Sequence, residues 1–288
     1  MSLSETWKTE HGLELRLRKW SVESSPAAQL WISHGFGEHS GRYDEFAGHM
    51  TGAGCEVFSW DHQGFGESQG SRGHVDDFSA YARDGLAIIE ANRNNELPQF
   101  LLGHSMGTLI ALDLILDFRL NVDGLILSAP AFGIAHQPSK VQKLLLDKAG
   151  QAIHPGLKFK TGTDPSMGTH DPEIIARHRE DPLAVHKISL GLYRNLIQTG
   201  EAHAGRGTEL FTPLLLLQGS EDPVVRVDWV NAYFESVSST DKHMELCPGC
   251  YHEVLNETER SQVYELVSRW ISDRVGAPKV AGDGESSS

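Results

Sequence analysis

Short apolar segments of strand length alternate with segments of helical periodicity, and this alternation constrains the fold more than any other feature of the chain. We expect strands at 29–33, 56–60, 100–103, 124–128, 213–218 and 243–246. We expect helices at 43–53, 80–93, 106–118, 229–237 and 258–274. Such alternation is typical of a mostly parallel sheet with helices on both faces. The sequence therefore predicts an α/β fold, which a β-hairpin over residues 5–22 precedes.

The interval between Ala129 and Thr212 breaks this alternation, because it contains amphipathic stretches and Pro/Gly-rich joints but no segment that predicts a strand. We interpret it as a helical cap inserted into the core. The last residues are small and polar without periodicity, which is typical of a disordered tail. The predicted organisation is a first part of the core at 1–130, the cap at 131–210, a second part of the core at 211–275 and the tail at 276–288.

The charge of the chain argues against nucleic acid as a partner. Lys and Arg total 25 against 39 Asp and Glu, so the net charge of −14 opposes a phosphate backbone. We see neither an apolar leader segment nor the roughly 18 consecutive apolar residues of a membrane span. Cys55, Cys247 and Cys250 are too few, and odd in number, for a disulfide framework. We therefore expect a cytoplasmic protein.

Two segments match the pattern Gly-x-Ser-x-Gly, one around Ser105 and one around Ser68. An apolar strand leads directly into the first segment and an apolar helix follows it, which is the context that a nucleophilic serine requires. The second segment lies in a polar, Gly-rich loop without either neighbour. Context therefore favours Ser105 as the nucleophile.

A sharp turn at Ser105 crowds the backbone, and Gly103 and Gly107 relieve that crowding. The serine then projects at a helix N-terminus, where N–H groups and the helix dipole favour a developing oxyanion. A Gly/Ser turn without chemistry is the alternative interpretation.

A serine hydroxyl needs a base that a third group orients, and enzymes that carry their serine on such a turn have the chain order serine, acid, histidine. Asp222 follows an apolar strand, where sheets of this kind place functional side chains. Glu221 and Asp228 are the alternative carboxylates, and Asp228 fits the start of a helix better. Among 15 histidines, position must decide. His252 lies in the loop after the next strand and is the predicted base, whereas His243 lies within that strand.

The segment His34-Gly35-Phe36-Gly37 follows the first buried strand. In esterases an HG loop at this place supplies one oxyanion donor, and the residue after the nucleophile supplies the other. The predicted donors are the backbone N–H groups of Phe36 and Met106. An ordinary glycine turn is the alternative.

These motifs together resemble the monoacylglycerol lipase and lysophospholipase branch of the serine α/β-hydrolases. The resemblance covers residues 10–274 and is strongest outside the cap. It is carried by residues 34–43, 61–68, 103–107, 217–222 and 251–253.

The resemblance implies an α/β-hydrolase fold and the hydrolysis of carboxylic esters through an acyl-serine, without a metal or an organic cofactor. It gives Ser105 the role of nucleophile, Asp222 that of orienting acid and His252 that of general base and then acid. It also places polar residues near the glycerol end of the substrate pocket. The matching substrate-binding candidates are Glu38, Arg42 and His104, although Glu38 and Arg42 could equally form a structural ion pair.

The sequence departs from the family pattern in two places. Thr108 stands where the turn often has a further glycine, and Cys247 and Cys250 precede His252. A C-x-x-C pair can be redox-active or bind zinc, but zinc needs two more ligands. We favour a packing or incidental role for these thiols.

The predicted function is hydrolysis of a monoacylglycerol or a similar single-chain lipid ester. One alternative is a prolyl aminopeptidase, for whose acidic pocket Glu38, Glu67 and Glu201 are candidates. Another is a binding protein of hydrolase fold without catalysis.

Transient membrane contact of the cap is also expected, because apolar residues recur at helical spacing in a segment with a net positive charge. The apolar residues are Val141, Leu144, Leu145, Ala149 and Ile153. The charged residues are Lys140, Lys143, Lys148, Lys158 and Lys160, with Asp147 as the opposing charge. Packing of these leucines on the core is the alternative.

Overall fold

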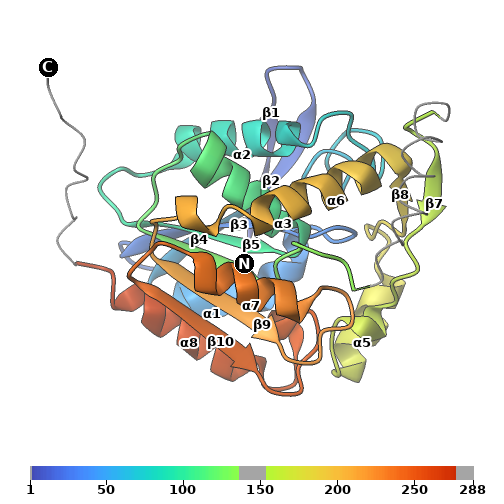
Figure 1. Cartoon of the computed structure of the whole chain (residues 1–288). Helices are drawn as coiled ribbons and strands as arrows, with labels where there is room; N and C mark the ends of the chain where they lie inside the picture. The colour runs from blue at the N-terminus through green and yellow to red at the C-terminus, as the bar shows by residue number, and fades with distance from the viewer. Residues whose placement is uncertain (1, 136–153, 277–288) are drawn as a thin grey trace, which may run out of the picture.

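The computed structural model describes residues 2–135 and 154–276. An eight-stranded sheet runs through the molecule in the order β1-β2-β4-β3-β5-β6-β9-β10 (Figure 1). The hairpin strands and β4 are paired antiparallel, and the remaining neighbours are parallel. The prediction of a hairpin followed by a mostly parallel sheet is therefore confirmed. The strands are β1 (Leu3–Lys8), β2 (Glu14–Trp20), β3 (Ala28–Ser33), β4 (Cys55–Trp60), β5 (Gln99–His104), β6 (Gly124–Ser128), β9 (Leu214–Gly219) and β10 (Lys242–Cys247).

The sheet separates two apolar cores, because successive side chains of a strand point to opposite faces. In β9, Leu214 and Leu216 belong to one core, and Leu215 and Leu217 belong to the other. This arrangement explains why the central strands are apolar at nearly every position. The first core contains residues of α2 (Ser79–Asn92), α3 (Met106–Leu112), α6 (Leu190–Ala204) and α7 (Val227–Ser236), and the second contains residues of α1 (Asp44–Gly52) and α8 (Arg260–Ser272).

The helices differ from the predicted ranges mainly at their ends. The helix expected at 106–118 is α3 followed by a π-helical turn, η2 (Asp113–Asp117). A 3-10 turn, Ser40–Tyr43, precedes α1, and another, Val254–Asn256, lies between β10 and α8. No helix among the described residues is long and apolar enough to cross a membrane.

The interval 129–212 contains the expected helices but also two strands, so the prediction of no strand there is wrong. β7 (Lys158–Lys160) pairs antiparallel with β8 (Lys187–Ser189). Three residues are too few to show a period, which is why the sequence gave no signal. The helices are α5 (Pro172–Glu180) and α6, and α6 packs against α3 of the core. In Figure 1, α5, β7 and β8 lie at one side of the sheet.

Part of the interval lies outside the described residues. That part holds Lys140, Val141, Lys143, Leu144, Leu145, Asp147, Lys148, Ala149 and Ile153, whereas Lys158 and Lys160 lie in β7. The predicted tail, from residue 277 onward, is also outside them. The domain boundaries at 130, 210 and 275 stay a prediction.

Candidate active site

Ser105 occupies a strained turn between β5 and α3. Its backbone has φ of 51° and ψ of −118°, a conformation that a residue with a side chain rarely adopts. The turn is crowded, since a Cβ at Gly107 would lie 2.0 Å from the carbonyl oxygen of Ser33. The Ser105 N–H donates to the carbonyl of Ser128 at 2.9 Å. These contacts fix the serine at the carboxyl edge of the sheet, as in a nucleophile turn.

Three side chains from three loops form a continuous hydrogen-bonded chain at this edge. His252 Nε2 lies 2.9 Å from Ser105 Oγ, and His252 Nδ1 lies 2.8 Å from Asp222 Oδ2. The loops follow β5, β9 and β10, whose parallel carboxyl ends meet there. The structure therefore brings together the three residues that the chain order selected.

Asp222 is held by three donors besides His252. Its Oδ1 accepts the N–H groups of Val224 and Val225 at 2.7 and 3.0 Å, and its Oδ2 accepts from Gln218 Nε2 at 3.0 Å. Burial raises the pKa of Asp222, but His252 and the backbone donors outweigh burial, so this pKa lies below its usual range. Burial lowers the pKa of His252, but Asp222 outweighs burial and raises it. The pair is built to stabilise an imidazolium beside the serine.

The alternative acid and base residues lie apart from this chain. Glu221 is exposed, and Asp228 lies in the first turn of α7, where it pairs with Arg226. His243 is exposed in β10, with its Nε2 3.6 Å from Glu245. Among the described residues, no hydrogen bond or ion pair joins any of the three to Ser105 or His252.

The predicted oxyanion donors lie on either side of Ser105 in the fold. Met106 is the first residue of α3, where a helix has N–H groups without intrahelical acceptors. Phe36 follows β3 and lines the same cavity as Ser105. A Cβ at the preceding Gly35 would lie 3.1 Å from Ser105 Cβ, so this loop lies directly against Ser105. Their role as donors stays a prediction.

The suggested ion pair between Glu38 and Arg42 is wrong. Arg42 donates from Nε and a terminal nitrogen to Asp181 Oδ2, at 3.0 and 2.8 Å. Glu38 Oε1 instead accepts the Gly35 N–H at 2.5 Å and the Tyr43 hydroxyl at 3.2 Å. Asp181 follows α5, so its 139-residue separation from Arg42 gave no sequence signal.

His104 is buried next to the proposed base. Its ring centroid lies 5.0 Å from that of His252, and its Nδ1 lies 3.2 Å from Ser128 Oγ. Burial, together with the charge of His252, lowers the pKa of His104 to about 4. His104 is therefore neutral near pH 7.

A cavity of about 440 Å³ opens above Ser105 and His252. Its apolar lining includes Phe36, Phe159 and Leu196, and its polar lining includes Arg42, His178 and Glu253. Sequence reasoning missed His178 and Glu253, although Glu253 directly follows the predicted base. The cavity offers both apolar and polar surface to a molecule that reaches Ser105.

The two thiols before His252 are unpaired. Cys247 is buried and Cys250 is partly exposed. Burial raises the pKa of both, for Cys247 to about 12, so they are protonated near neutral pH. Neither cysteine belongs to a group with metal-ligand spacing among the described residues.

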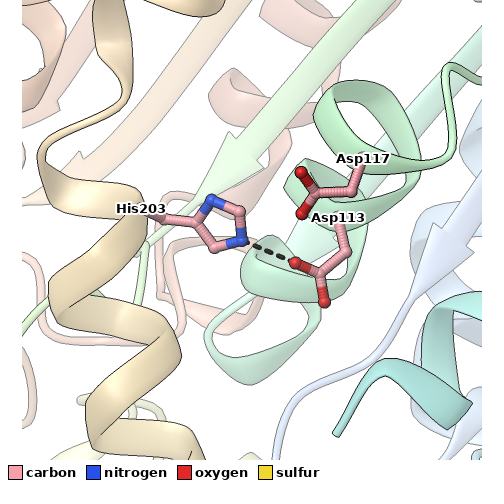
Figure 2. Close-up of side chains that lie close together, drawn as sticks. All are labelled: Asp113, Asp117 and His203. Carbon is pink, nitrogen blue, oxygen red and sulfur yellow. Dashed lines mark hydrogen bonds and ion pairs between the residues drawn. The ribbon is translucent and has the colours of Figure 1, made fainter.

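Such a group does occur away from Ser105, where Asp113, Asp117 and His203 approach one another (Figure 2). Their potential ligand atoms lie within 4.8 Å of each other. His203 Nε2 is bound to Asp113 Oδ1 at 2.7 Å, and Arg206 binds both oxygens of Asp117 at 2.8 and 3.1 Å. These bonds join η2 to the end of α6, so the cluster fits a structural contact between core and cap.

The fold and the serine site define a serine hydrolase of the α/β-hydrolase fold. A family model described as "Serine aminopeptidase, S33" matches residues 24–259. The chain is 33% identical to the monoacylglycerol lipase of Mycolicibacterium smegmatis over 90% of this chain and 93% of that one, and 35% identical to phospholipase YtpA of Bacillus subtilis over 85% and 95%.

A solved structure is similar as well. The monoacylglycerol lipase of Paleococcus ferrophilus aligns with a TM-score of 0.82 and 28% identity, covering 91% of this chain and 99% of that one. The chain therefore belongs to the S33 serine hydrolase family, in the branch that contains the monoacylglycerol lipases. It is a serine ester hydrolase.

Proposed function

We propose that this protein hydrolyses monoacylglycerols, or closely similar single-chain esters, with Ser105 as nucleophile, His252 as base and Asp222 as orienting acid. The observation that carries this proposal is the chain of two hydrogen bonds, 2.9 and 2.8 Å long, below a cavity with apolar and polar walls. The monoacylglycerol lipases among the relatives support the choice of substrate.

The first half of the reaction forms the acyl-enzyme. His252 Nε2 accepts the hydroxyl proton as Ser105 Oγ attacks the ester carbonyl. The N–H groups of Phe36 and Met106 stabilise the carbonyl oxygen as it becomes an oxyanion. The C–O bond then breaks, the alcohol leaves with the proton from His252, and the acyl group stays on Ser105.

The second half repeats these steps with water as the nucleophile. His252 takes a proton from water, the hydroxide oxygen bonds to the acyl carbon, and Ser105 leaves with the proton from His252. Asp222 keeps the imidazole in one tautomer throughout, because its carboxylate accepts the Nδ1 hydrogen. The products are a fatty acid and an alcohol.

An amide hydrolase is the second candidate, because the family model carries the name of an aminopeptidase. An aminopeptidase needs a carboxylate available to the substrate amine. Glu67 is paired with Arg16 and Arg18, and Glu38 accepts bonds from Gly35 and Tyr43. These pairings occupy Glu38 and Glu67, and the comparison of ester and amide rates decides between the two candidates.

Hydrolysis rates on one preparation test the proposal. The substrates are monoacylglycerols, lysophospholipids, short nitrophenyl esters and an aminoacyl amide. We expect the highest kcat/KM on a monoacylglycerol. A higher value on the aminoacyl amide would replace the proposal with an aminopeptidase, and absence of turnover on the whole panel would favour a binding protein.

We also propose that the cap contacts lipid surfaces while substrate enters. Leu157 is 57% exposed and Phe159 is 39% exposed, and the exposed Lys158 and Lys160 lie beside them. Phe159 also lines the cavity, so this surface adjoins the substrate site. Apolar and basic side chains together suit an anionic lipid surface.

Leu157→Ser tests the cap contact. We expect a higher apparent KM for a long-chain ester in anionic vesicles and no change for a soluble short-chain ester. Leu3→Ser is the matched control, because Leu3 is 71% exposed on β1. Equal effects of the two substitutions in vesicles would contradict the proposed contact.

A further inference from the structure

A second, small cavity of about 10 Å³ adjoins the substrate cavity, and Arg42 and Glu253 line both. Its other polar walls are Glu38, Tyr43, His104 and Asn256. A volume of this size holds about one water molecule. The small cavity therefore marks a polar pocket beside the nucleophile.

Glu38 stands close to Ser105. A Cβ at Gly35 would lie 2.7 Å from Glu38 Oε1 and 3.1 Å from Ser105 Cβ, so the carboxylate and the nucleophile flank the same backbone position. The Glu38 side chain is 8% exposed, and its Oε1 lies 3.9 Å from His104 Nε2. Glu38 lines the small cavity rather than the substrate cavity, so its charge acts on the leaving alcohol from behind the Gly35 backbone.

Glu253 lines both cavities and is fixed there by hydrogen bonds. Its N–H donates to the Gly168 carbonyl at 2.7 Å, and its Oε2 accepts from Asn256 Nδ2 at 2.7 Å. His178 Nδ1 lies 3.5 Å from the same oxygen. No donor among residues 2–135 and 154–276 is bonded to Oε1, so this oxygen can accept from a bound molecule.

The pocket is negatively charged. Burial raises the pKa of Glu253, but the neighbouring positive charge, to which Arg42 contributes, and the Asn256 hydrogen bond outweigh burial and lower it, so the side chain is ionised. Burial also lowers the pKa of His178 and of His104, which keeps both rings neutral.

The guanidinium of Arg42 does not reverse this charge. Two of its nitrogens donate to Asp181, which His39 also contacts at 3.1 Å. Arg42 is thus paired with Asp181, and no guanidinium or ammonium group among the described residues forms an ion pair with Glu38 or Glu253, so negative charge is in excess. Because two nitrogens of Arg42 donate to Asp181, fewer of its N–H groups remain to bind an anionic ligand.

We propose that Glu253, together with Glu38, makes the alcohol side of the cavity a charge filter that admits uncharged hydroxylated leaving groups and rejects esters whose alcohol carries a phosphate. Carboxylate oxygens accept hydrogen bonds from hydroxyl groups, whereas a phosphate brings like charge and no donor. The inference rests on the proposed function, because it assumes that the ester binds in this cavity. It separates monoacylglycerols from lysophospholipids, which the relatives do not separate.

The test compares 1-decanoylglycerol with 1-decanoylglycerol 3-phosphate, both below their critical micelle concentrations and at one ionic strength. We expect a much higher kcat/KM for the uncharged ester. Glu253→Gln should reduce the ratio of the two kcat/KM values by about tenfold, mainly by raising that of the phosphate ester. Any effect of the substitution on His252 is common to both esters, so the ratio cancels it.

Two variants define the cause. Glu253→Asp keeps the charge and should keep most of the discrimination. Glu221→Gln is the matched control, because it removes an equal charge from an exposed position in a loop of the same site. We expect an unchanged ratio for the control.

Equal kcat/KM values for the two esters in the wild-type protein would overturn the filter without any variant. An unchanged ratio in Glu253→Gln would overturn the role of Glu253. Failure of the wild-type protein to hydrolyse 1-decanoylglycerol would instead contradict the proposed function, so the two failures are distinguishable.

Discussion

Ser105 and Ser68 occupy the same Gly-x-Ser-x-Gly pattern in two different environments. Ser105 joins β5 to α3, and its hydroxyl faces His252 Nε2 at 2.9 Å. The Ser68 hydroxyl donates to the Asp61 carbonyl at 2.6 Å and accepts the Arg16 N–H at 2.8 Å. One hydroxyl is available to a base, whereas the other bridges two backbone segments.

The glycines of the two motifs also serve different contacts. A Cβ at Gly107 would meet the Ser33 carbonyl at 2.0 Å, where α3 begins against the sheet. A Cβ at Gly66, whose φ is +49°, would meet the Asp61 carboxylate at 2.1 Å. In both motifs the glycine is required because another group lies close to its backbone. The chemistry of each motif depends instead on which group the serine hydroxyl faces.

The largest expected effect separates the two serines directly. Ser105→Ala should abolish labelling by a fluorophosphonate probe and lower kcat by about three or more orders of magnitude, because it removes the proposed nucleophile. Ser68→Ala should do neither. Gel-based labelling and turnover of a soluble ester measure both outcomes, and full labelling of the Ser105→Ala protein would refute the assignment.

The next effect tests the groups behind Ser105. Asp222→Asn should lower kcat by about two to four orders of magnitude, since an amide no longer fixes the His252 tautomer. Glu221→Gln should change kcat little, because this exposed carboxylate does not contact His252. Steady-state rates give the comparison, and the reverse order would move the orienting acid to Glu221.

A pH profile tests whether Ser105 depends on a neutral base. Asp222 raises the pKa of His252 despite burial, so imidazolium persists to higher pH than for an ordinary histidine. Activity requires the neutral form, and kcat/KM should therefore rise with pH through this elevated pKa. An acid limb below the usual histidine range, measured on a soluble ester, would contradict the assignment.

Modification of Cys250 tests how closely the site depends on the loops around it. The Cys250 carbonyl accepts the Glu221 N–H at 3.0 Å, so this residue connects the loops that carry Asp222 and His252. A bulky maleimide on Cys250 should inhibit turnover about tenfold or more by displacing these loops.

The control for this modification is Cys250→Ser, which should keep its activity under the same treatment. Mass spectrometry locates the label. Complete labelling of Cys250 with unchanged turnover would show that the thiol lies outside the working site.

The smallest expected effect is on the free energy of unfolding. Here Ser68→Ala should have the larger effect and Ser105→Ala the smaller one, the opposite of their effects on activity. Ser68→Ala leaves a buried carbonyl and N–H without partners and should lower the free energy of unfolding by about 1 to 3 kcal/mol. Ser105→Ala should lower the free energy of unfolding less, since among the described residues its hydroxyl bonds only to the His252 side chain. Thermal or urea unfolding measures both, and equal losses would contradict this division.

The sequence by itself determined the order of strands and helices, because apolar periodicity is local and depends on which face each residue buries. It also determined Ser105, Asp222 and His252 as a group, since each follows a buried strand whose carboxyl end lies at one edge of the sheet. Ser68 could be set aside for the same reason, as it lacks a flanking strand and helix.

Only the tertiary structure decided the polar contacts between core and cap. Arg42 pairs with Asp181 rather than Glu38, and His178 and Glu253 meet at the cavity, although no periodicity connects these residues. The strands β7 and β8 are likewise three residues each and became visible only through their pairing. Such contacts depend on how the loops and the cap pack over the sheet, so side chains far apart in sequence become neighbours without a local signal.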